Sequence, residues 1–447
     1  MFSVEKIAQI VEGKLLRSDG AWPTRAIHDS RLVQPGDLFV ALPGSHTDGH
    51  VYIGNAFAAG ACAALVANRQ AFPTTARNII VVRDPALALQ QLASAWRDTQ
   101  STTFVAITGS NGKTTVKALL GHVLASYKRT YVSPRNYNTE IGLPIALLSM
   151  PENTQLGIFE LGAERPGDIA MLANMLRPSL GILTSVGPSH LDGLGSIASV
   201  AAEKWSLAQA IPHDGTIIIN ADSQQLIERA GSAGCPVISA GLNGGDLRGH
   251  VLQAVPNLTI HLEGNNLSIS CGLLGAHNAA NVLLAAAAAH ALGMDWSAIS
   301  DQAASFKPIP HRLEPISASF GTILDDTYNA NPASMAAALR VLSDFGEVQA
   351  KRVFVFGEML GLGAGTDEFH RDVVRQAVDL PIDAILPIGA RAIAACKAQD
   401  DPRIALLSRE DIGSFVTEQF TAPTVILVKG SRALRLETLV EELAHGC

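Results

Sequence analysis

From Phe104 to about Lys307, short apolar runs alternate with helical stretches. "FVAITG" is followed by "TTVKALLGHVLASY", "LGIFELG" by "DIAMLANML", and "LGILTSVG" by "IASVAAEKWSLAQAI". Short apolar runs separated by amphipathic helices are typical of parallel strands that are buried on both faces. The alternation therefore predicts an α/β domain built on a mostly parallel sheet.

The chain before this stretch is organised differently, whereas the chain after it repeats the alternation. Before about Arg83 the segments are short, and "DLFVAL" alternates like a strand. The proline-rich run Phe306–His311 reads as a linker, after which "TILDD", "RVFVFGEM", "AILPIG" and "TVILVKG" resume the alternation. A chain of 447 residues is too long for one core and suggests two to four domains.

Composition excludes several classes of protein. The formal net charge of −8 offers no basic patch for nucleic acid, so an anionic substrate must meet local positive charge or a metal. Five scattered cysteines (Cys62, Cys235, Cys271, Cys396 and Cys447) form no C-x-x-C pair and are expected to be buried free thiols. The apolar run 282–289 is far too short to span a bilayer, and the N-terminus reads as an amphipathic helix rather than a signal peptide. We expect a cytoplasmic protein that binds neither nucleic acid nor membrane.

The segment "AITGSNGKTT" joins a predicted buried strand to a predicted helix. Glycines let backbone N–H groups converge on a phosphate, and the helix N-terminus adds partial positive charge. A lysine in this place can reach the β- and γ-phosphates, and the hydroxyl that follows suits a magnesium ion bound to them. The predicted nucleotide-binding residues are Gly109, Ser110, Asn111, Gly112, Lys113, Thr114 and Thr115, and the predicted ligand is a nucleoside triphosphate.

Two other interpretations of this segment are open. The general phosphate-loop pattern has a glycine where this chain has Ile107, so the match is to a shorter variant, and a glycine turn with a solvent-facing lysine is the alternative. The chain could also be a regulatory module whose nucleotide only switches its conformation.

Two residues near further strand ends could form a metal site beside the loop. Glu160 ends "LGIFE", His190 follows "LGILTSV", and ligands collect beyond the carboxyl ends of parallel strands. Magnesium prefers oxygen ligands, so a histidine would be an unusual partner. Taken singly, Glu160 could cap the following turn and His190 could be an ordinary hydrogen-bonded loop residue. Lys204, inside an apolar helix, could extend its amine to solvent.

Several motifs together resemble the Mur ligase family, in its order and spacing. They are "TGSNGKTT", "ELGAERPGDI", "SHLDGLGS", "AAEKW", "GAHNAANVLLAAAA", "HRLEP", "DDTYNANPASM" and "LVKGSR". The resemblance runs from Asp29–Arg31 nearly to the C-terminus. It implies a UDP-sugar-binding domain at residues 1–83, a central phosphate-loop ATPase domain at 84–309 and a Rossmann-like domain at 310–447, all of α/β class.

The resemblance also implies site residues. It assigns Thr114, Glu160, His190 and Lys204 to magnesium, with Lys204 matching a lysine that family members carbamoylate. It places Asn278 and Asn281 near adenine, although an N-cap role for Asn278 is the alternative. Arg312 is expected at the ATP phosphates and Asp326 at the ribose. The implied catalytic residues are Lys113, His190, Lys204 and Arg312.

The implied reaction joins D-alanyl-D-alanine to a UDP-N-acetylmuramoyl tripeptide, with ATP and Mg²⁺, in a monomeric enzyme of cell-wall synthesis. Ser30, Arg31, Asn136, Asn138 and Thr139 are expected at the sugar nucleotide. Asn329, Asn331, Lys429 and Ser431 are expected near the acceptor, where turn chemistry alone could explain the two asparagines. The alternatives are the ligase that adds the third residue, against which the absence of "DNPR" argues, and folylpolyglutamate synthetase, which would not be expected to keep "NYNTEIGLP".

Overall fold

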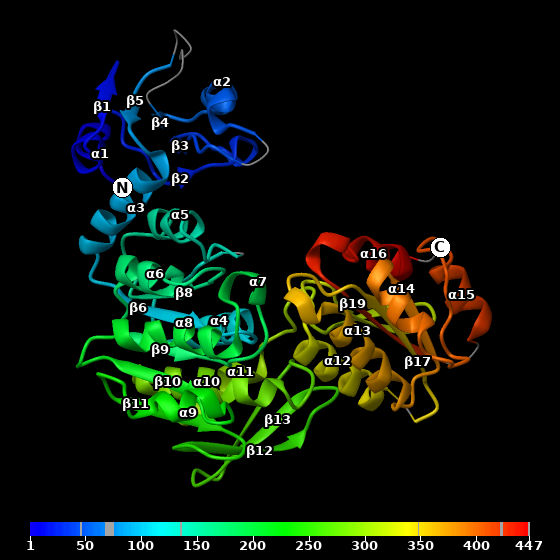
Figure 1. Ribbon diagram of the computed structural model, residues 1–447. Helices are drawn as coiled ribbons and strands as arrows, with labels where there is room; N and C mark the ends of the chain where they lie inside the picture. Colours follow the sequence, from blue (N-terminus) through cyan, green and yellow to red (C-terminus); the bar gives the residue numbers. More distant parts are fainter. Residues whose placement is uncertain (45–46, 68–75, 135, 347, 421–422, 446–447) are drawn as a thin grey trace.

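The computed structural model describes residues 1–44, 47–67, 76–134, 136–346, 348–420 and 423–445, and it contains three sheets in chain order (Figure 1). Each sheet combines parallel pairs with at least one antiparallel strand. The predicted class of three α/β domains is therefore confirmed.

The N-terminal sheet has five strands. Their order is β1 (Lys14–Leu16), β5 (Ile79–Val82), β4 (Ala63–Ala67), β3 (Leu38–Val40) and β2 (Ala26–Ile27), and only the β1–β5 pair is antiparallel. The helices of this part are α1 (Val4–Ile10), α2 (Ile53–Ala58) and the 3-10 turns η1 (Ser30–Leu32) and η2 (Gly49–Tyr52). Helix α3 (Pro85–Asp98) contacts α1 and β4 on one side and the central helices α5 and α6 on the other, so it lies between the first two sheets (Figure 1).

The central sheet has nine strands and carries most of the site. Their order is β14 (Leu267–Cys271), β13 (Leu258–Leu262), β12 (Leu247–Gln253), β11 (Val237–Gly241), β10 (Thr216–Asn220), β9 (Leu180–Leu183), β6 (Thr103–Thr108), β8 (Leu156–Glu160) and β7 (Thr130–Val132). The pairs from β7 to β12 are parallel, and β12 to β14 form an antiparallel extension.

Helices cover both faces of the central sheet because successive strand residues point to opposite sides. Phe104 and Ala106 of β6 pack toward α5 (Gly142–Leu148), α6 (Asp168–Leu176) and α8 (Ile197–Ala210). Val105 and Ile107 pack toward α4 (Lys113–Ala125), α10 (Asn278–Ala291) and α11 (Trp296–Ala304). The shorter helices α7 (Leu191–Leu194) and α9 (Gln224–Ala230) follow β9 and β10.

The third sheet follows the linker at residues 306–311. Its order is β15 (Glu314–Ala318), β16 (Gly321–Asp326), β19 (Thr424–Lys429), β17 (Lys351–Gly357) and β18 (Ala384–Ile388), with only β15–β16 antiparallel. One face packs on α12 (Pro332–Asp344), α13 (Thr366–Val378) and α14 (Ala390–Lys397), and the other on α15 (Ile412–Gln419) and α16 (Glu437–His445). The remaining 3-10 turns are η3 (Gly363–Gly365) and η4 (Arg432–Leu434).

Two expectations about the whole chain can be compared with the structure. Within the described part of the chain, none of the helices combines the length and the apolarity that crossing a bilayer requires. The expected burial of the thiols holds for Cys271 and Cys396 but is wrong for Cys62 and Cys235, which are half-buried, and Cys447 lies outside the described residues.

Candidate active site

The loop between β6 and α4 forms the floor of the site. Gly109 and Gly112 adopt positive φ values of 150° and 86°, and a Cβ on Gly112 would lie 2.2 Å from Oδ1 of Asn281, so only glycine allows this approach to α10. The amides of Ser110 and Asn111 donate to the carbonyl and the hydroxyl of Ser185, both over 2.9 Å. The first turn of α4, by contrast, has N–H groups without intrahelical acceptors, which is the usual basis of an anion site.

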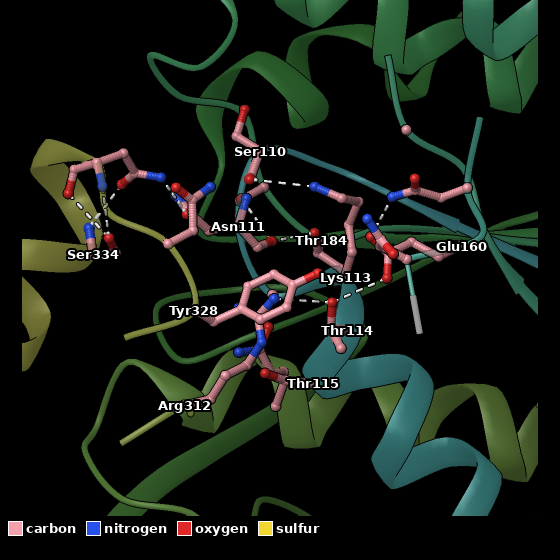
Figure 2. Close-up of a pocket in the computed structure, with 18 of the residues that line it drawn as sticks. Ser110, Asn111, Lys113, Thr114, Thr115, Glu160, Thr184, Arg312, Tyr328 and Ser334 are labelled. Carbon is pink, nitrogen blue, oxygen red and sulfur yellow. Dashed lines mark hydrogen bonds between the residues drawn. The ribbon is translucent and has the colours of Figure 1, made fainter. Parts of the chain in front are cut away.

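Lys113 lies over this loop rather than in solvent. Its Nζ donates to the carbonyl of Gly109 over 2.7 Å. It also donates to the carbonyl of Ser110 over 3.4 Å (Figure 2). Burial and the neighbouring Arg312 lower the pKa of Lys113, whereas the charge of Glu160 opposes them. The alternative of a solvent-facing lysine is therefore wrong.

Glu160 at the end of β8 is held by groups from two other elements. Its Oε2 accepts from the hydroxyl of Thr114 and its Oε1 from the side-chain amide of Asn138, each over 3.0 Å (Figure 2). Burial alone would raise the pKa of Glu160, but the positive charges of Lys113, Lys117 and Arg312 bring it below its ordinary value. Glu160 is thus a charged, oriented carboxylate, and both of its oxygens bond groups outside the turn that follows it.

Arg312, in the first turn after the linker, reaches across to the central domain. Its Nη2 donates to Oγ1 of Thr114 over 3.1 Å, and its guanidinium lies 4.3 Å from the centre of the Tyr328 ring. Figure 2 shows Arg312 and Tyr328, both from the third domain, beside Thr114 at the start of α4. The third domain therefore contributes a cation to the same site.

His190 and Lys204 line the same cavity as this loop. Burial lowers the pKa of His190, and the charges of Lys113 and Lys204 lower it further. Burial is also the main reason that the pKa of Lys204 falls to about 7, with Lys113 contributing. Lys204 is 1% exposed, so the alternative in which its amine reaches solvent is wrong.

A cavity of about 690 Å³ brings most of the predicted site residues together. Those that line it are Ser110, Asn111, Gly112, Lys113, Thr114, Thr115, Asn136, Asn138, Thr139, Glu160, His190, Lys204, Asn278, Asn281, Arg312, Asp326, Asn329, Asn331 and Lys429. Gly109, Ser30, Arg31 and Ser431 do not line it. Arg31 is an exposed residue of η1 paired with Asp29, and Ser431 accepts from the amide of Leu360 over 2.9 Å.

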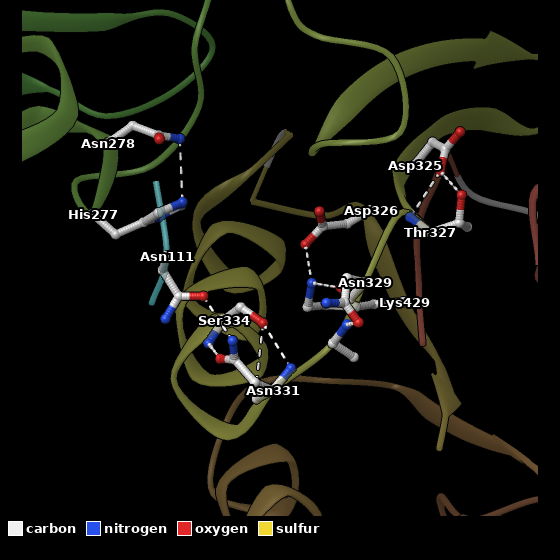
Figure 3. A network of polar contacts seen from close by, with 11 residues as sticks. Asn111, His277, Asn278, Asp325, Asp326, Thr327, Asn329, Asn331, Ser334 and Lys429 are labelled. Atoms are coloured by element: carbon white, nitrogen blue, oxygen red, sulfur yellow. Dashed lines mark hydrogen bonds and ion pairs between the residues drawn. The ribbon is translucent and has the colours of Figure 1, made fainter. Parts of the chain in front are cut away.

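The third domain closes one side of this cavity with a polar network (Figure 3). Lys429 pairs with Oδ2 of Asp326 over 2.7 Å and donates to the carbonyl of Asn329 over 2.8 Å. Asn331 caps α12 through Ser334, and its Nδ2 also donates to Oδ1 of Asn111 over 2.7 Å. The phosphate loop and the start of α12 are therefore in direct contact.

The alternative of an N-cap role for Asn278 is wrong. Asn278 is the first helical residue of α10, and its Nδ2 donates to the carbonyl of Leu274 over 2.8 Å. Its Oδ1 accepts from Nδ2 of Asn281 over the same distance, which aligns both amides at the cavity wall. The proposal that these residues face a nucleotide base stays a prediction.

Sequence reasoning missed several lining residues. Tyr328 and His277 lie inside the quoted motifs "DDTYNANPASM" and "GAHN", so the signal was present. Arg165 and Glu164 belong to the loop after β8, where the strand-end rule applies as it does to Glu160.

The oxygen donors of this site fit a magnesium ion that arrives with a nucleotide. Magnesium usually takes one or two protein oxygens and completes its shell with water and phosphate. Thr114 Oγ1 and the Glu160 carboxylate, 3.0 Å apart, supply such a pair. Within the described ranges, no three His, Cys, Asp or Glu side chains converge as a metal cluster, so phosphate oxygens would have to share the ion.

Comparison with known proteins gives the family. Family models match residues 27–97 (Mur ligase family, catalytic domain), 107–289 (Mur ligase middle domain) and 311–432 (Mur ligase, glutamate ligase domain). A *Bacillus subtilis* relative, UDP-N-acetylmuramoyl-tripeptide–D-alanyl-D-alanine ligase, is 31% identical, over 99% of this chain and 98% of its own. The chain belongs to the Mur ligase family.

Solved structures of Mur ligases agree with this assignment. MurF from *Acinetobacter baumannii* superposes with a TM-score of 0.89 at 28% identity, over 99% of both chains. MurF from *Thermotoga maritima*, solved with ADP, gives 0.83 at 27% identity, over 94% of this chain and 97% of that one. A ligase that adds 2,6-diaminopimelate reaches only 0.55 at 17% identity, over 98% of this chain and 99% of that one, and shows a shared fold alone.

Proposed function

We propose that this Mur ligase joins D-alanyl-D-alanine to UDP-N-acetylmuramoyl tripeptide, with ATP, to give the pentapeptide precursor of peptidoglycan. The observation that carries this proposal is the convergence of the phosphate loop, Glu160, His190, Lys204 and Arg312 on one cavity. The relatives named for this reaction match nearly the full length of the chain.

The reaction requires the activation of a poor electrophile. The terminal carboxylate of the tripeptide attacks the γ-phosphate of ATP, the bond to the β-phosphate oxygen breaks, and an acyl phosphate and ADP form. The amine of D-alanyl-D-alanine then attacks the acyl carbon, loses a proton, and inorganic phosphate leaves. Phosphoryl transfer of this kind depends mainly on positioning and on neutralising charge.

The chain supplies these two effects from two domains. Lys113 and the first turn of α4 bind the phosphates from the central domain, and Arg312 adds a cation from the third domain. Thr114 and Glu160 would hold Mg²⁺, together with His190 and Lys204, and the ion would neutralise charge on the transferred phosphate. Closure of the domains over the cavity would keep water from the acyl phosphate.

Lys204 is suited to carbamoylation in this scheme. Its buried amine has a pKa of about 7, so a large fraction is neutral and nucleophilic at neutral pH. The amine attacks carbon dioxide, a proton is released, and the new carboxylate points into the cavity that Lys204 lines. The modification would convert a positive charge into an oxygen ligand for a divalent cation.

The remaining contacts divide between the other substrates and ATP. Ser30 and Arg31 would bind the uridine nucleotide from the N-terminal domain, and the loop with Asn136, Asn138 and Thr139 would meet the sugar. Asn329, Asn331, Lys429 and Ser431 would line the acceptor path, Asp326 would meet the ribose, and Asn278 and Asn281 the adenine. We expect a monomer in the cytoplasm.

Release of inorganic phosphate tests the proposal directly. The purified protein is incubated with ATP, Mg²⁺ and UDP-N-acetylmuramoyl tripeptide, with and without D-alanyl-D-alanine. We expect release to depend on both substrates and the pentapeptide to appear by mass spectrometry. Hydrolysis that ignores both substrates would refute the ligase assignment, and activity with a free diamino acid and the dipeptide precursor would favour the third-residue ligase.

A further inference from the structure

A second lysine of α4 approaches Glu160 without lining the cavity. Lys117 lies one turn after Lys113 and three residues after Thr114, so the three side chains share one face of the helix. Lys117 is only 4% exposed and does not belong to the cavity wall. It therefore reaches the site from the protein interior.

The contacts of Lys117 connect three elements. Its Nζ lies 3.8 Å from Oε2 of Glu160, at the end of β8, and donates to the carbonyl of Ser133 over 2.9 Å. Ser133 directly follows β7 and its amide donates to the carbonyl of Ile158 in β8. Lys117 thus ties helix α4 to both strands at the edge where the site is built.

The same contact bears on Asn138. Asn138 follows Ser133 closely in the sequence, and its side-chain amide donates to Oε1 of Glu160. Lys117 and Thr114 hold one carboxylate oxygen and Asn138 the other, so rotation of the carboxylate would break contacts with both. Removing a lysine from water costs free energy, so a buried lysine needs partners such as Glu160 and Ser133. A lysine with its amine in solvent would not hold the Glu160 carboxylate in place.

We propose that Lys117 is a positioning residue that fixes the Glu160 carboxylate toward the phosphate loop from behind the cavity. It acts through Glu160 and does not touch the nucleotide. The contact between Lys117 and Glu160 is independent of the proposed function. Only the effect of this contact on catalysis rests on that function, because it requires Glu160 to take part in the reaction.

A double-mutant cycle in protein without nucleotide tests the contact itself. Lys117→Met keeps the length of the side chain and leaves Glu160 without this counter-charge. We expect it to lower the midpoint of thermal unfolding by about 5 °C or more. In a Glu160→Gln background the same change should lower the midpoint by less than half as much, because the carboxylate charge that Lys117 helps to compensate is gone. Equal shifts in both backgrounds would overturn the proposal.

The kinetic cycle tests the role in catalysis. Lys117→Met should lower kcat about tenfold or more and leave the KM for D-alanyl-D-alanine within about twofold, since only the Glu160 side of the site is disturbed. Added to Glu160→Gln, it should lower kcat little further. A further tenfold loss in the double variant would show that Lys117 acts independently of Glu160.

Two additional observations keep the test decisive. If Lys117→Met does not fold, the proposal requires that the double variant folds, and failure of both overturns it. Lys397→Met, an exposed lysine at the end of α14, serves as the matched control and should change neither midpoint nor kcat. The unfolding cycle needs no substrate, so its outcome is separate from that of the ligase assay.

Discussion

Lys113 combines a fixed position with a charge that the reaction needs. Its amine lies against the carbonyl of Gly109, at the N-terminus of α4. We expect Lys113→Ala to reduce kcat by about 10²–10³-fold or more, because a preorganised cation at the phosphates is lost. Phosphate release measures the effect. Circular dichroism should show an unchanged fold, and Lys6→Ala on exposed surface is the control. Normal ligation by Lys113→Ala would mean that ATP binds elsewhere.

Lys204 predicts a pH dependence of stability. Its pKa in the folded protein is about 7, below the value of about 10.4 in an unfolded chain. Between these values the unfolded state binds a proton that the folded state does not, so wild-type stability rises with pH and this contribution is lost as pH falls toward 7. Lys204→Met should remove up to about 1.4 kcal/mol per pH unit of this slope.

Urea unfolding at pH 7, 8 and 9, in buffer free of carbon dioxide, measures this slope. Parallel curves for wild type and Lys204→Met would contradict the prediction, and Lys6→Met should follow wild type. In the ligase assay, Lys204→Ala should lose most activity, and bicarbonate should change the activity of the wild type but not that of the variant. Wild-type rates in Lys204→Ala would exclude an active-site role.

Helix α6 depends on a carboxylate from a different helix. Its N-cap is Gly167, which has no side chain to accept from the first turn. Glu203 of α8 accepts instead from the amides of Gly167 and Ile169, over 2.8 and 2.7 Å. Its negative charge also suits the helix N-terminus. Glu203 directly precedes Lys204 in α8. The cap therefore holds the part of α8 that carries Lys204 against the N-terminus of α6, next to the loop with Glu164 and Arg165.

We expect Glu203→Gln to destabilise the protein by about 1–3 kcal/mol, because one of the two amides would face a side-chain N–H and lose its acceptor. Chemical denaturation measures the loss. Glu228→Gln, at an exposed position of α9 where the carboxylate accepts from the side chain of Gln224 in the same helix, should change stability by less than about 0.5 kcal/mol. Equal losses of stability in the two variants would show that the bonds from Glu203 to the amides of α6 add no stability beyond that of a surface contact.

The convergence of Glu160, His190 and Lys113 was predictable because parallel strands end at the same edge of a sheet. The three-domain α/β class followed from the alternation of strands and helices together with the family motifs. The contact between Lys117 and Glu160 was not predicted. A lysine in an amphipathic helix is compatible with solvent exposure, and periodicity does not show which side chains pack behind a strand. The alternative N-cap role of Asn278 is wrong because α10 begins at Asn278 itself, and its side-chain amide bonds Leu274 and Asn281.

Two side chains of the third domain contact the phosphate loop and the first turn of α4. Asn331 bonds Asn111 of the loop and Arg312 bonds Thr114 in the first turn of α4, so both partners belong to the segment that would bind phosphate. These two contacts hold the third domain directly against the nucleotide-binding segment. Asn331 also caps α12, and an alanine there would remove the cap and the contact together.

Asn331→Asp separates the cap of α12 from the contact between the two domains. The aspartate keeps an oxygen for the amide of Ser334, but it replaces the donor to Asn111 with a carboxylate that faces a carbonyl oxygen. We expect an unchanged unfolding midpoint and a larger radius of gyration by solution X-ray scattering, because the contact between domains becomes repulsive. Asn266→Asp, in the turn after β13, is the control. If Asn331→Asp scatters like wild type and ligates at the same rate, the amide contact does not hold the two domains together.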